Sequence, residues 1–282
     1  MTAAGIDRSG TLFVVGTPIG NLDDLSPRAR EALESADIVA AEDTRRTRGL
    51  LSHFRPEVRI IAYHEHNEAE RIQELVAALE RGAKVSLVSD AGTPAISDPG
   101  MKLVRAARAA GITVIPIPGP SAVLAALSAC GLPTDRFVFE GFLPRRSQAR
   151  AERLEALRLE PRTIVFFEAV HRIAETLAAL RDAFGGERQA AIARELTKVH
   201  EQIVSASLAE LTTRLGGDIP LLGEFVIVVA GAADDAPADA AEAERVYALL
   251  KAELEPRRAL ALTAAITGVP RNALYKLLRV AE

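Results

Sequence analysis

The sequence predicts an α/β protein of two lobes, with a mostly parallel sheet in the first lobe, a mixed sheet in the second and a small helical C-terminal appendage. Three observations predict it. Short apolar runs alternate with longer helical patterns over residues 1–131, as in βαβ units. Strand-like runs are more closely spaced over residues 132–231, which favours mixed pairing. An Ala- and acid-rich linker, residues 232–244, then precedes a basic tail, residues 245–282.

The totals are those of an ordinary globular protein. The 282 residues suffice for two compact units, and 49% hydrophobic residues allow a substantial core. A net charge of -4 gives no global sign of polyanion binding, although it does not exclude local basic clusters. Cys130 is the single cysteine, which rules out an internal disulfide and fits a reducing compartment. The N-terminal residues lack the pattern of a signal peptide, and no run of 18 apolar residues occurs, so we expect a cytoplasmic protein that does not span a membrane.

The elements of the first lobe follow from apolar runs and caps. Thr11–Val15 is β-branched and aromatic and precedes a Gly/Pro turn, as a buried strand does. Ser26 and Pro27 supply an N-cap and a first helical residue for a helix to about Ala36. The other expected strands are Ile38–Ala41, Val58–Ala62, Val85–Val88 and Ile112–Ile115. The other expected helices start at Asp43 or span Asn67–Arg81, Lys102–Ala110 and Ser121–Cys130. Gly131-Leu132-Pro133 predicts the hinge between the lobes.

The second lobe and the tail show the same kinds of pattern. Strands are expected near Phe137–Glu140, Thr163–Phe167, Gln189–Arg194, Glu201–Ala206 and Glu224–Ala230. Helices are expected at Ser147–Leu159, His171–Phe184 and Leu208–Leu215. The tail holds seven basic residues against three acidic ones and has the pattern of two or three short helices, with a turn at 267–270.

Three Gly/Pro-rich loops follow predicted strands of the first lobe. Loop one is Gly16–Asn21, loop two is Ser89–Pro94 and loop three is Pro118–Ala122. Loop one has neither the Walker nor the dinucleotide-binding glycine pattern. Ligands of open α/β sheets bind outside the carboxyl ends of the strands, so we expect the three loops to enclose one pocket. Glycine permits close backbone approach there, and proline stiffens the loop.

Several motifs also occur in an order that resembles one known family. They are GTPIGNL at Gly16–Leu22, AEDTR at Ala41–Arg45, VSDAGTPAISDPG at Val88–Gly100, Pro118–Ala122, GFLP at Gly141–Pro144, RELTK at Arg194–Lys198 and Gly223–Phe225. The chain thereby resembles the ribosomal RNA small subunit methyltransferase I family, within the tetrapyrrole-methylase-like (class III) methyltransferases. The resemblance covers residues 11–231, and the tail resembles the helix-turn-helix-like tail of many members.

The resemblance implies a two-lobed tetrapyrrole-methylase-like fold, a homodimer and S-adenosylmethionine bound between the lobes. It implies methylation of the ribose 2′-hydroxyl of a cytidine in the decoding region of 16S rRNA, so the partner would be 16S rRNA or the small ribosomal subunit. The implied cofactor contacts are Ile19, Asp90, Thr93, Ile96, Ser121, Ala122, Phe167, Leu196 and Gly223. The last three lie in weaker stretches and are placed by their order along the chain.

Methyl transfer from a sulfonium needs no metal and no covalent enzyme intermediate. The protein must hold the ribose oxygen about 3–3.5 Å from the methyl carbon and help to remove its proton. Polar residues able to do this follow two strands, namely Glu42, Asp43, Arg45, Arg194, Glu195 and Lys198. A neutral lysine can act as a base, whereas an arginine can only stabilise charge. We expect Lys198 or Glu195 near the proton and Arg45 on the substrate backbone.

Basic residues after GFLP and in the tail are the predicted RNA contacts. They are Arg145, Arg146 and Arg150, with Arg153 nearby, then Arg271 and Lys276, with Arg279 and Tyr275 beside them. Such groups suit phosphate contacts that position RNA without determining sequence specificity. A solvated helix face is the alternative interpretation, above all for the tail.

Two other features have ordinary explanations. His64-Glu65-His66 places two imidazoles on one strand face, but without a third ligand it indicates a solvated strand end, and we expect no metal. Cys130 ends an apolar helix and is expected in the core.

Other functions remain open from sequence alone. A tetrapyrrole carbon methylase or a diphthine synthase would share the fold, and methyl transfer to a tetrapyrrole rather than to ribosomal subunits would distinguish it. A non-catalytic RNA-binding protein would show no saturable S-adenosylmethionine binding. A dinucleotide-dependent oxidoreductase would need the glycine fingerprint that loop one lacks.

Overall fold

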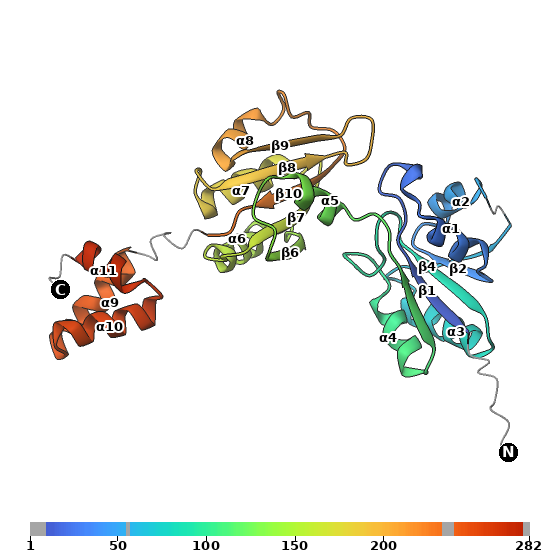
Figure 1. Ribbon diagram of the computed structural model, residues 1–282, viewed down its shortest axis with the longest axis horizontal. Helices are drawn as coiled ribbons and strands as arrows, with labels where there is room; N and C mark the ends of the chain where they lie inside the picture. Colours follow the sequence, from blue (N-terminus) through green and yellow to red (C-terminus); the bar gives the residue numbers. More distant parts are fainter. Residues whose placement is uncertain (1–9, 55–56, 233–239, 279–282) are drawn as a thin grey trace, which may run out of the picture.

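The computed structural model describes residues 10–54, 57–232 and 240–278. The first lobe holds a five-stranded sheet in the order β3-β2-β4-β1-β5, in which every neighbouring pair is parallel (Figure 1). Its strands are β1 (Thr11–Val15), β2 (Ile38–Ala41), β3 (Arg59–Ala62), β4 (Lys84–Val88) and β5 (Thr113–Ile117). All five carboxyl ends therefore meet at one edge, as the alternating pattern predicted.

Helices cover both faces of this sheet. They are α1 (Pro27–Glu34), α2 (Thr44–Leu51), α3 (Glu68–Glu80) and α4 (Met101–Ala109), with a short 3-10 helix η1 (Leu22–Asp24). Side chains of α3 and α4 share one hydrophobic core with Leu12, Ala40 and Leu87, whereas α1 and α2 share the other with Val15, Val39 and Val88. Residues adjacent in a strand thus enter opposite cores, because side chains alternate across a sheet.

The second lobe holds the mixed sheet that the close strand spacing predicted. Its order is β6-β7-β10-β8-β9, with β6 and β7 parallel and the other pairs antiparallel. The strands are β6 (Phe137–Phe142), β7 (Thr163–Ala169), β8 (Gln189–Arg194), β9 (Gln202–Ser207) and β10 (Glu224–Val229). Helices α6 (Ser147–Leu157), α7 (Ile173–Phe184) and α8 (Leu208–Arg214) pack with one face of this sheet.

Helix α5 (Ala122–Ala129) corrects the expected boundary between the lobes. It was expected in the first lobe, before a hinge at 131–133, but Val123, Ala126 and Leu127 pack against the second sheet. Figure 1 shows α5 beside that sheet, after an extended segment leaving β5. An apolar helix of small residues fits either sheet, so its sequence did not reveal the choice. Loop three is therefore the covalent junction between the lobes.

The tail forms three helices, α9 (Ala240–Glu253), α10 (Pro256–Thr267) and α11 (Arg271–Leu278). Ala259, Leu260 and Leu274 belong to their separate small core. Residues 240–244 were expected in the linker but are helical, as their Ala- and Glu-rich composition allows. None of the helices in the described ranges has the length and apolar character needed to cross a membrane.

Candidate functional site

The three Gly/Pro-rich loops meet at the carboxyl edge of the first sheet. Loop one pairs with loop two through hydrogen bonds between Thr17 and Gly92, in both directions, at 2.9 and 3.1 Å. Thr17 is 3% exposed, and its hydroxyl also donates to the backbone oxygens of Ser89 and Gly92. Loop one contacts loop three so closely that a Cβ on Gly16 would lie 2.8 Å from the backbone of Gly119. Glycine is needed at this crossing because both backbones occupy the space of a side chain.

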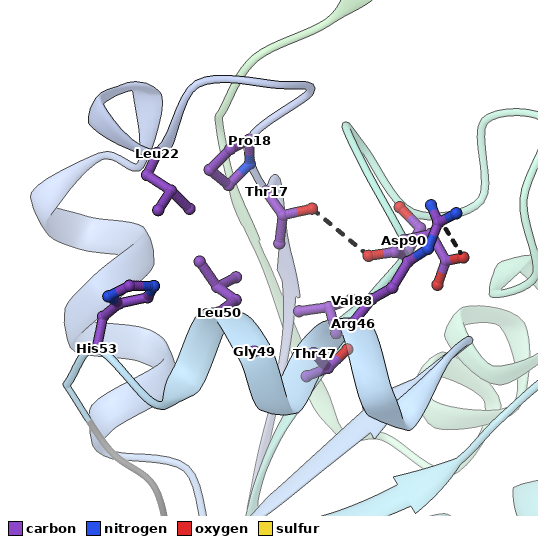
Figure 2. A pocket seen from close by; sticks show the side chains of 11 residues that line it. Thr17, Pro18, Leu22, Arg46, Thr47, Gly49, Leu50, His53, Val88 and Asp90 are labelled. Carbon is purple, nitrogen blue, oxygen red and sulfur yellow. Dashed lines mark hydrogen bonds and ion pairs between the residues drawn. The ribbon is translucent and has the colours of Figure 1, made fainter.

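Two hollows, rather than the expected single pocket, lie beside these loops. The α2 pocket, about 180 Å³, is lined by Thr17, Pro18, Leu22, Arg46, Thr47, Gly49, Leu50, His53, Val88, Ser89 and Asp90 (Figure 2). The α5 pocket, about 500 Å³, is lined by Ile19, Asp24, Gly119, Pro120, Ser121, Leu124, Ala125, Ser128 and Thr197. Loop one separates them, because Thr17 and Pro18 line the first and Ile19 the second. Thr197 belongs to the second lobe, so both lobes contribute to the α5 pocket.

Three carboxyl groups gather near loop two. Burial raises the pKa of Glu42, and the charges of Asp98 and Asp90 raise it further. Burial likewise raises the pKa of Asp98, against a hydrogen bond from Ser89. Glu42 Oε2 is buried and has no hydrogen-bond partner among the described residues. This cluster disfavours additional negative charge and favours a donor group or a cation.

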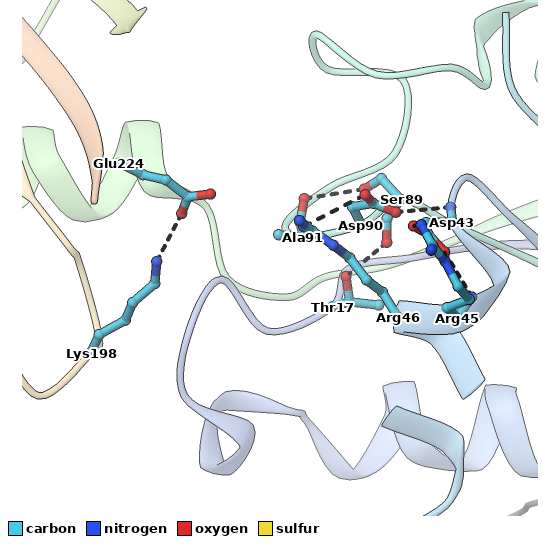
Figure 3. A network of polar contacts seen from close by, with 9 residues as sticks. All are labelled: Thr17, Asp43, Arg45, Arg46, Ser89, Asp90, Ala91, Lys198 and Glu224. Carbon is cyan, nitrogen blue, oxygen red and sulfur yellow. Dashed lines mark hydrogen bonds and ion pairs between the residues drawn. The ribbon is translucent and has the colours of Figure 1, made fainter. Parts of the chain in front are cut away.

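Basic side chains of α2 lie next to these carboxyl groups. Asp43 caps α2, and its carboxylate binds the Arg45 backbone and guanidinium at 2.8–3.3 Å. The hydrogen bonds from Arg45 lower the pKa of Asp43 to about 2. Asp90 accepts from the Asp43 backbone at 2.9 Å and lies 3.6 Å from the Arg46 guanidinium (Figure 3). Arg45 and Arg46 remain largely exposed, at 88% and 64% of their side chains, so both can contact a ligand.

A buried arginine joins the second-lobe loops. Arg194 ends β8, is 7% exposed, and donates to the backbone oxygens of Leu222 at 3.1 Å and His200 at 3.0 Å. It thereby connects the loop after β8 with the loop before β10. From the sequence we considered Arg194 only as a charge near the reaction, because a single sequence does not show that it is buried.

Lys198 and Glu195 lie together in the loop after β8. The Lys198 ammonium donates to Glu195 at 2.7 Å and to Glu224 at 3.0 Å. Burial alone would lower the pKa of Lys198, but its bonds to both carboxylates raise the pKa above the ordinary value. The bond from Lys198 lowers the pKa of Glu195. Lys198 is therefore a cation here, and the neutral lysine that could act as a base is disfavoured.

Glycines bring this loop close to its neighbours. A Cβ on Gly20 would lie 2.4 Å from Lys198 Cγ, so loop one and the Lys198 side chain are in contact across the lobes. A Cβ on Gly223, whose φ is +87°, would lie 2.4 Å from the Glu195 side chain. Gly223 is thus required for the position of Glu195. Among the described residues no ion pair links this group to Arg45, which Figure 3 shows on the first lobe.

Left-handed backbone occurs at four non-glycine residues of two loops. They are Ala95 and Ser97 after loop two, and Glu195 and Thr197 after β8, with φ between 52° and 70°. Each such residue costs about 1 kcal/mol or more, and such strain is typical of ligand-binding loops. The strained residues lie in both lobes, and Thr197 among them lines the α5 pocket.

Comparison with known proteins agrees with this geometry. The model of the tetrapyrrole (corrin/porphyrin) methylases matches residues 11–212, and that of the RsmI C-terminal HTH domain matches residues 237–278. A ribosomal RNA small subunit methyltransferase I from Xylella fastidiosa is 55% identical over 94% of this chain and 98% of its own length. The chain belongs to the ribosomal RNA small subunit methyltransferase I family. The predicted enzyme class, a methyltransferase that uses S-adenosylmethionine, is confirmed.

Solved structures show the same fold at low identity. A diphthine synthase aligns with a TM-score of 0.61 at 18% identity, covering 78% of this chain and 90% of its own. A uroporphyrin-III C-methyltransferase from Thermus thermophilus, solved with S-adenosylhomocysteine, aligns with a TM-score of 0.55 at 19% identity, covering 78% and 97%. The predicted two-lobed tetrapyrrole-methylase-like fold is confirmed.

The six expected cofactor contacts on and next to the three loops fall into three groups. Ile19 and Ser121 line the α5 pocket, with Ala122 directly after Ser121, which caps α5. Asp90 lines the α2 pocket instead, while Thr93 and the half-exposed Ile96 line neither hollow.

The other expected contacts belong to the second lobe. Leu196 is buried in the core beneath α5, and Phe167 packs edge-to-face on Phe139 and Phe142 with ring centroids 4.9 and 5.7 Å apart. Gly223 adjoins Glu195. The structure thus brings Ile19, Ser121 and Ala122 together and gives the second-lobe residues packing functions as well.

The expected RNA contacts are corrected in one case. Arg145 and Arg146 are exposed, as required, and so is Arg271. Arg150, however, is 4% exposed and pairs with Glu175. Its position one helical turn before Leu154 places it on the buried face of α6. Arg150 is therefore not an RNA contact in this structure.

Other residues of this set are less available than expected. Arg153 forms two bonds to Glu140 at 2.8 Å, and Tyr275 packs partly against the tail core instead of being free to stack. The Lys276 side chain and Arg279 lie outside the described residues.

The structure also gives contacts for the two remaining sequence features, the His64–His66 pair and Cys130. His64 contacts Asn67, and its ring lies 6.0 Å from that of His66, while no group of three metal-ligating side chains occurs among the described residues. Cys130 is buried and donates to the Leu127 oxygen, as expected of a core residue.

Proposed function

We propose that this chain methylates the ribose 2′-hydroxyl of a cytidine in the decoding region of 16S rRNA. The observation that carries the proposal is the α5 pocket, which loop one, loop three and the second lobe build together in a member of this family. The finer assignment to ribose and cytidine comes from the resemblance of the motifs. We also propose a cytoplasmic homodimer, on the same resemblance.

The α5 pocket fits S-adenosylmethionine. Its volume of about 500 Å³ lies within the ordinary range for small-molecule sites. The small side chains of Ala125 and Ser128 leave space beside α5. Ile19 and Leu124 supply apolar surface, and the Ser121 hydroxyl supplies a polar group. S-Adenosylmethionine supplies a methyl group on a positively charged sulfur. We propose Asp90, Thr93 and Ile96 as further contacts when the lobes enclose it.

The proton of the ribose hydroxyl is the second requirement. In the proposed step the oxygen–methyl bond forms as the sulfur–methyl bond breaks, and the hydroxyl proton passes to the Glu195 carboxylate, which its lowered pKa keeps ionised and so able to accept. The Lys198 ammonium stabilises negative charge on the oxygen, because its raised pKa keeps it protonated. Arg45, exposed on α2, binds the substrate backbone.

The RNA surface is proposed from exposed basic residues. Arg145 and Arg146 precede α6, and Arg271 begins α11; Lys276, whose side chain lies outside the described residues, is added from the sequence alone. These residues position phosphates of the small subunit without base contacts. Removing residues 240–282 should weaken subunit binding and flatten its salt dependence, while S-adenosylmethionine binding stays intact. An unchanged salt slope would rule out an electrostatic function of the tail.

The proposal is tested by methyl transfer. The protein is incubated with labelled S-adenosylmethionine and small subunits from cells lacking it, and the labelled nucleoside is identified after digestion. We expect 2′-O-methylcytidine at one position. Label in a base, or transfer to a tetrapyrrole but not to subunits, would overturn the proposal.

A further inference from the structure

Helix α2 contains a glycine that the fold does not explain. Gly49 lies inside α2, where glycine costs about 1 kcal/mol relative to alanine. Among the described glycines without a positive φ, Gly49 alone has no heavy atom within 4 Å of where its Cβ would lie. Neither backbone conformation nor protein packing therefore requires glycine there. The open space beside Gly49 leaves room for a ligand to approach the helix backbone.

Gly49 borders the α2 pocket, whose walls differ in character. Pro18, Leu22 and Leu50 form an apolar side, and Leu22 is 52% exposed although it is a large aliphatic residue. Figure 2 shows these side chains around the hollow, with His53 beside Leu50 and with Arg46 and Asp90 on the other side. An apolar wall with polar groups opposite it suits a flat ring that carries hydrogen-bonding atoms.

The size of the pocket limits its occupant. Its volume of about 180 Å³ is below the roughly 300–1,000 Å³ of typical small-molecule sites. One nucleobase is a suitable occupant, whereas a whole cofactor is too large. The pocket adjoins the α5 pocket across loop one, so a nucleotide held in it lies next to the methyl donor's proposed site.

The surface around the pocket carries positive charge. Helix α2 has the sequence TRRTRGLL, with three arginines and no acidic residue. Arg46 has its nearest carboxylate at 3.6 Å, and exposed Arg48 forms no ion pair with another described residue. Both can bind phosphates on either side of a nucleotide.

We propose that the α2 pocket receives the base of a nucleotide that is unstacked from the RNA substrate, with Arg46 and Arg48 holding the flanking phosphates. The inference rests on the proposed function, because the RNA is the methyl acceptor. Enzymes that modify a nucleotide within structured nucleic acid commonly turn it out of the stack into such a pocket. Gly49 provides room for the base edge beside the helix backbone.

A size series at Gly49 tests the proposal. Gly49→Ala, Gly49→Leu and Gly49→Trp progressively fill the pocket, and Gln73→Leu adds a leucine to an exposed position of α3 as a control. Methylation of small subunits, S-adenosylmethionine binding by calorimetry and thermal unfolding are measured for each. We expect kcat/KM for subunits to fall about 100-fold for Leu and further for Trp. Cofactor affinity should stay within twofold, and Ala should not lower the unfolding temperature.

Each outcome bears on the proposal. Wild-type activity on Gly49→Trp would show that the pocket holds no part of the substrate. Loss of S-adenosylmethionine binding in the Leu variant would assign the pocket to the cofactor and overturn the inference. Failure of the wild-type protein to methylate subunits would instead contradict the proposed function. No heavy atom lies within 4 Å of a Cβ built on Gly49, so a lower unfolding temperature of the Ala variant would contradict the open space at this position.

Discussion

The two sheets supply loops to the site by different means. In the first lobe every strand pair is parallel, so the loops after β1, β4 and β5 reach one edge through topology alone. In the second lobe the strands are mostly antiparallel, and the loops before β10 and after β8 are joined by the buried side chain of Arg194. Parallel topology thus brings the first-lobe loops to one edge, whereas in the second lobe antiparallel pairing sets the end of β8 beside the start of β10, and the buried Arg194 side chain joins the two adjacent loops further.

The largest effect should come from closing the hollow that both lobes share. Ala125→Phe places a ring in the α5 pocket, and we expect S-adenosylmethionine affinity to fall on the order of 1,000-fold, about 4.1 kcal/mol. Calorimetric titration measures it. Ala129→Phe, at an exposed position of the same helix that lines neither hollow, should bind normally. Equal affinity of the two variants would show that the lobes do not share the cofactor site.

The second prediction breaks the connection in the mixed sheet. Arg194→Met leaves the oxygens of His200 and Leu222 without their donor, and we expect the free energy of unfolding to fall by about 3 kcal/mol. Urea denaturation measures it. Arg181→Met removes an arginine that pairs with its exposed neighbour Asp182, and it should change stability by less than about 0.5 kcal/mol. A small loss for Arg194→Met would remove the proposed difference between the sheets.

The third prediction compares a glycine from each lobe. Gly16→Ala meets the Gly119 backbone and should cost about 3 kcal/mol of unfolding free energy, in the Glu195→Ala background as well. Gly223→Ala meets the Glu195 side chain at a positive φ and should cost about 2 kcal/mol. In the Glu195→Ala background, the cost of Gly223→Ala should fall to about 1 kcal/mol, which is the contribution of the positive φ alone. Full additivity in denaturation experiments would contradict the Gly223–Glu195 contact.

The smallest effect concerns pH and the carboxyl cluster of the first lobe. Burial and the neighbouring acids raise the pKa of Glu42, so the folded chain holds this proton to higher pH than the unfolded chain. The resulting loss of unfolding free energy is absent below pH 4.5, which is the ordinary pKa of a glutamate, and is complete above the raised pKa. Glu42→Gln should therefore stabilise the protein at pH 7, by less than about 1 kcal/mol after solvent screening, and not at pH 4. A gain that is the same at both pH values would exclude this cause.

The sequence predicted the elements of both lobes well, for reasons visible in single strands. Thr11–Val15 is strand β1 because a β-branched run before a Gly/Pro turn has few alternatives. The second-lobe strand Gln189–Arg194 was also predicted at its observed limits. Such patterns are local, and the structure retains them.

What could not be predicted depends on contacts between distant segments. The apolar residues of α5 fit either sheet, so its packing on the second sheet required the fold. The burial of Arg150 depends on the register of α6, which neither its charge nor its neighbours reveal. Loop one, which pairs with loop two through Thr17 and Gly92, lies between two hollows where a single pocket was expected, and no turn pattern in the sequence predicts that pairing. Gly49 did offer a signal, a glycine inside a helical pattern, that we did not use.

The most direct test of the account is the position of the methyl group on the acceptor. A ribose that carries a 2′-O-methyl group cannot attack its 3′ phosphate, so alkaline hydrolysis leaves a gap in the RNA ladder after that nucleotide. Small subunits treated with this protein and S-adenosylmethionine should yield 16S rRNA with one new gap, at a cytidine of the decoding region. A complete ladder from RNA that has taken up one methyl group per molecule would place the methyl on a base and contradict the account.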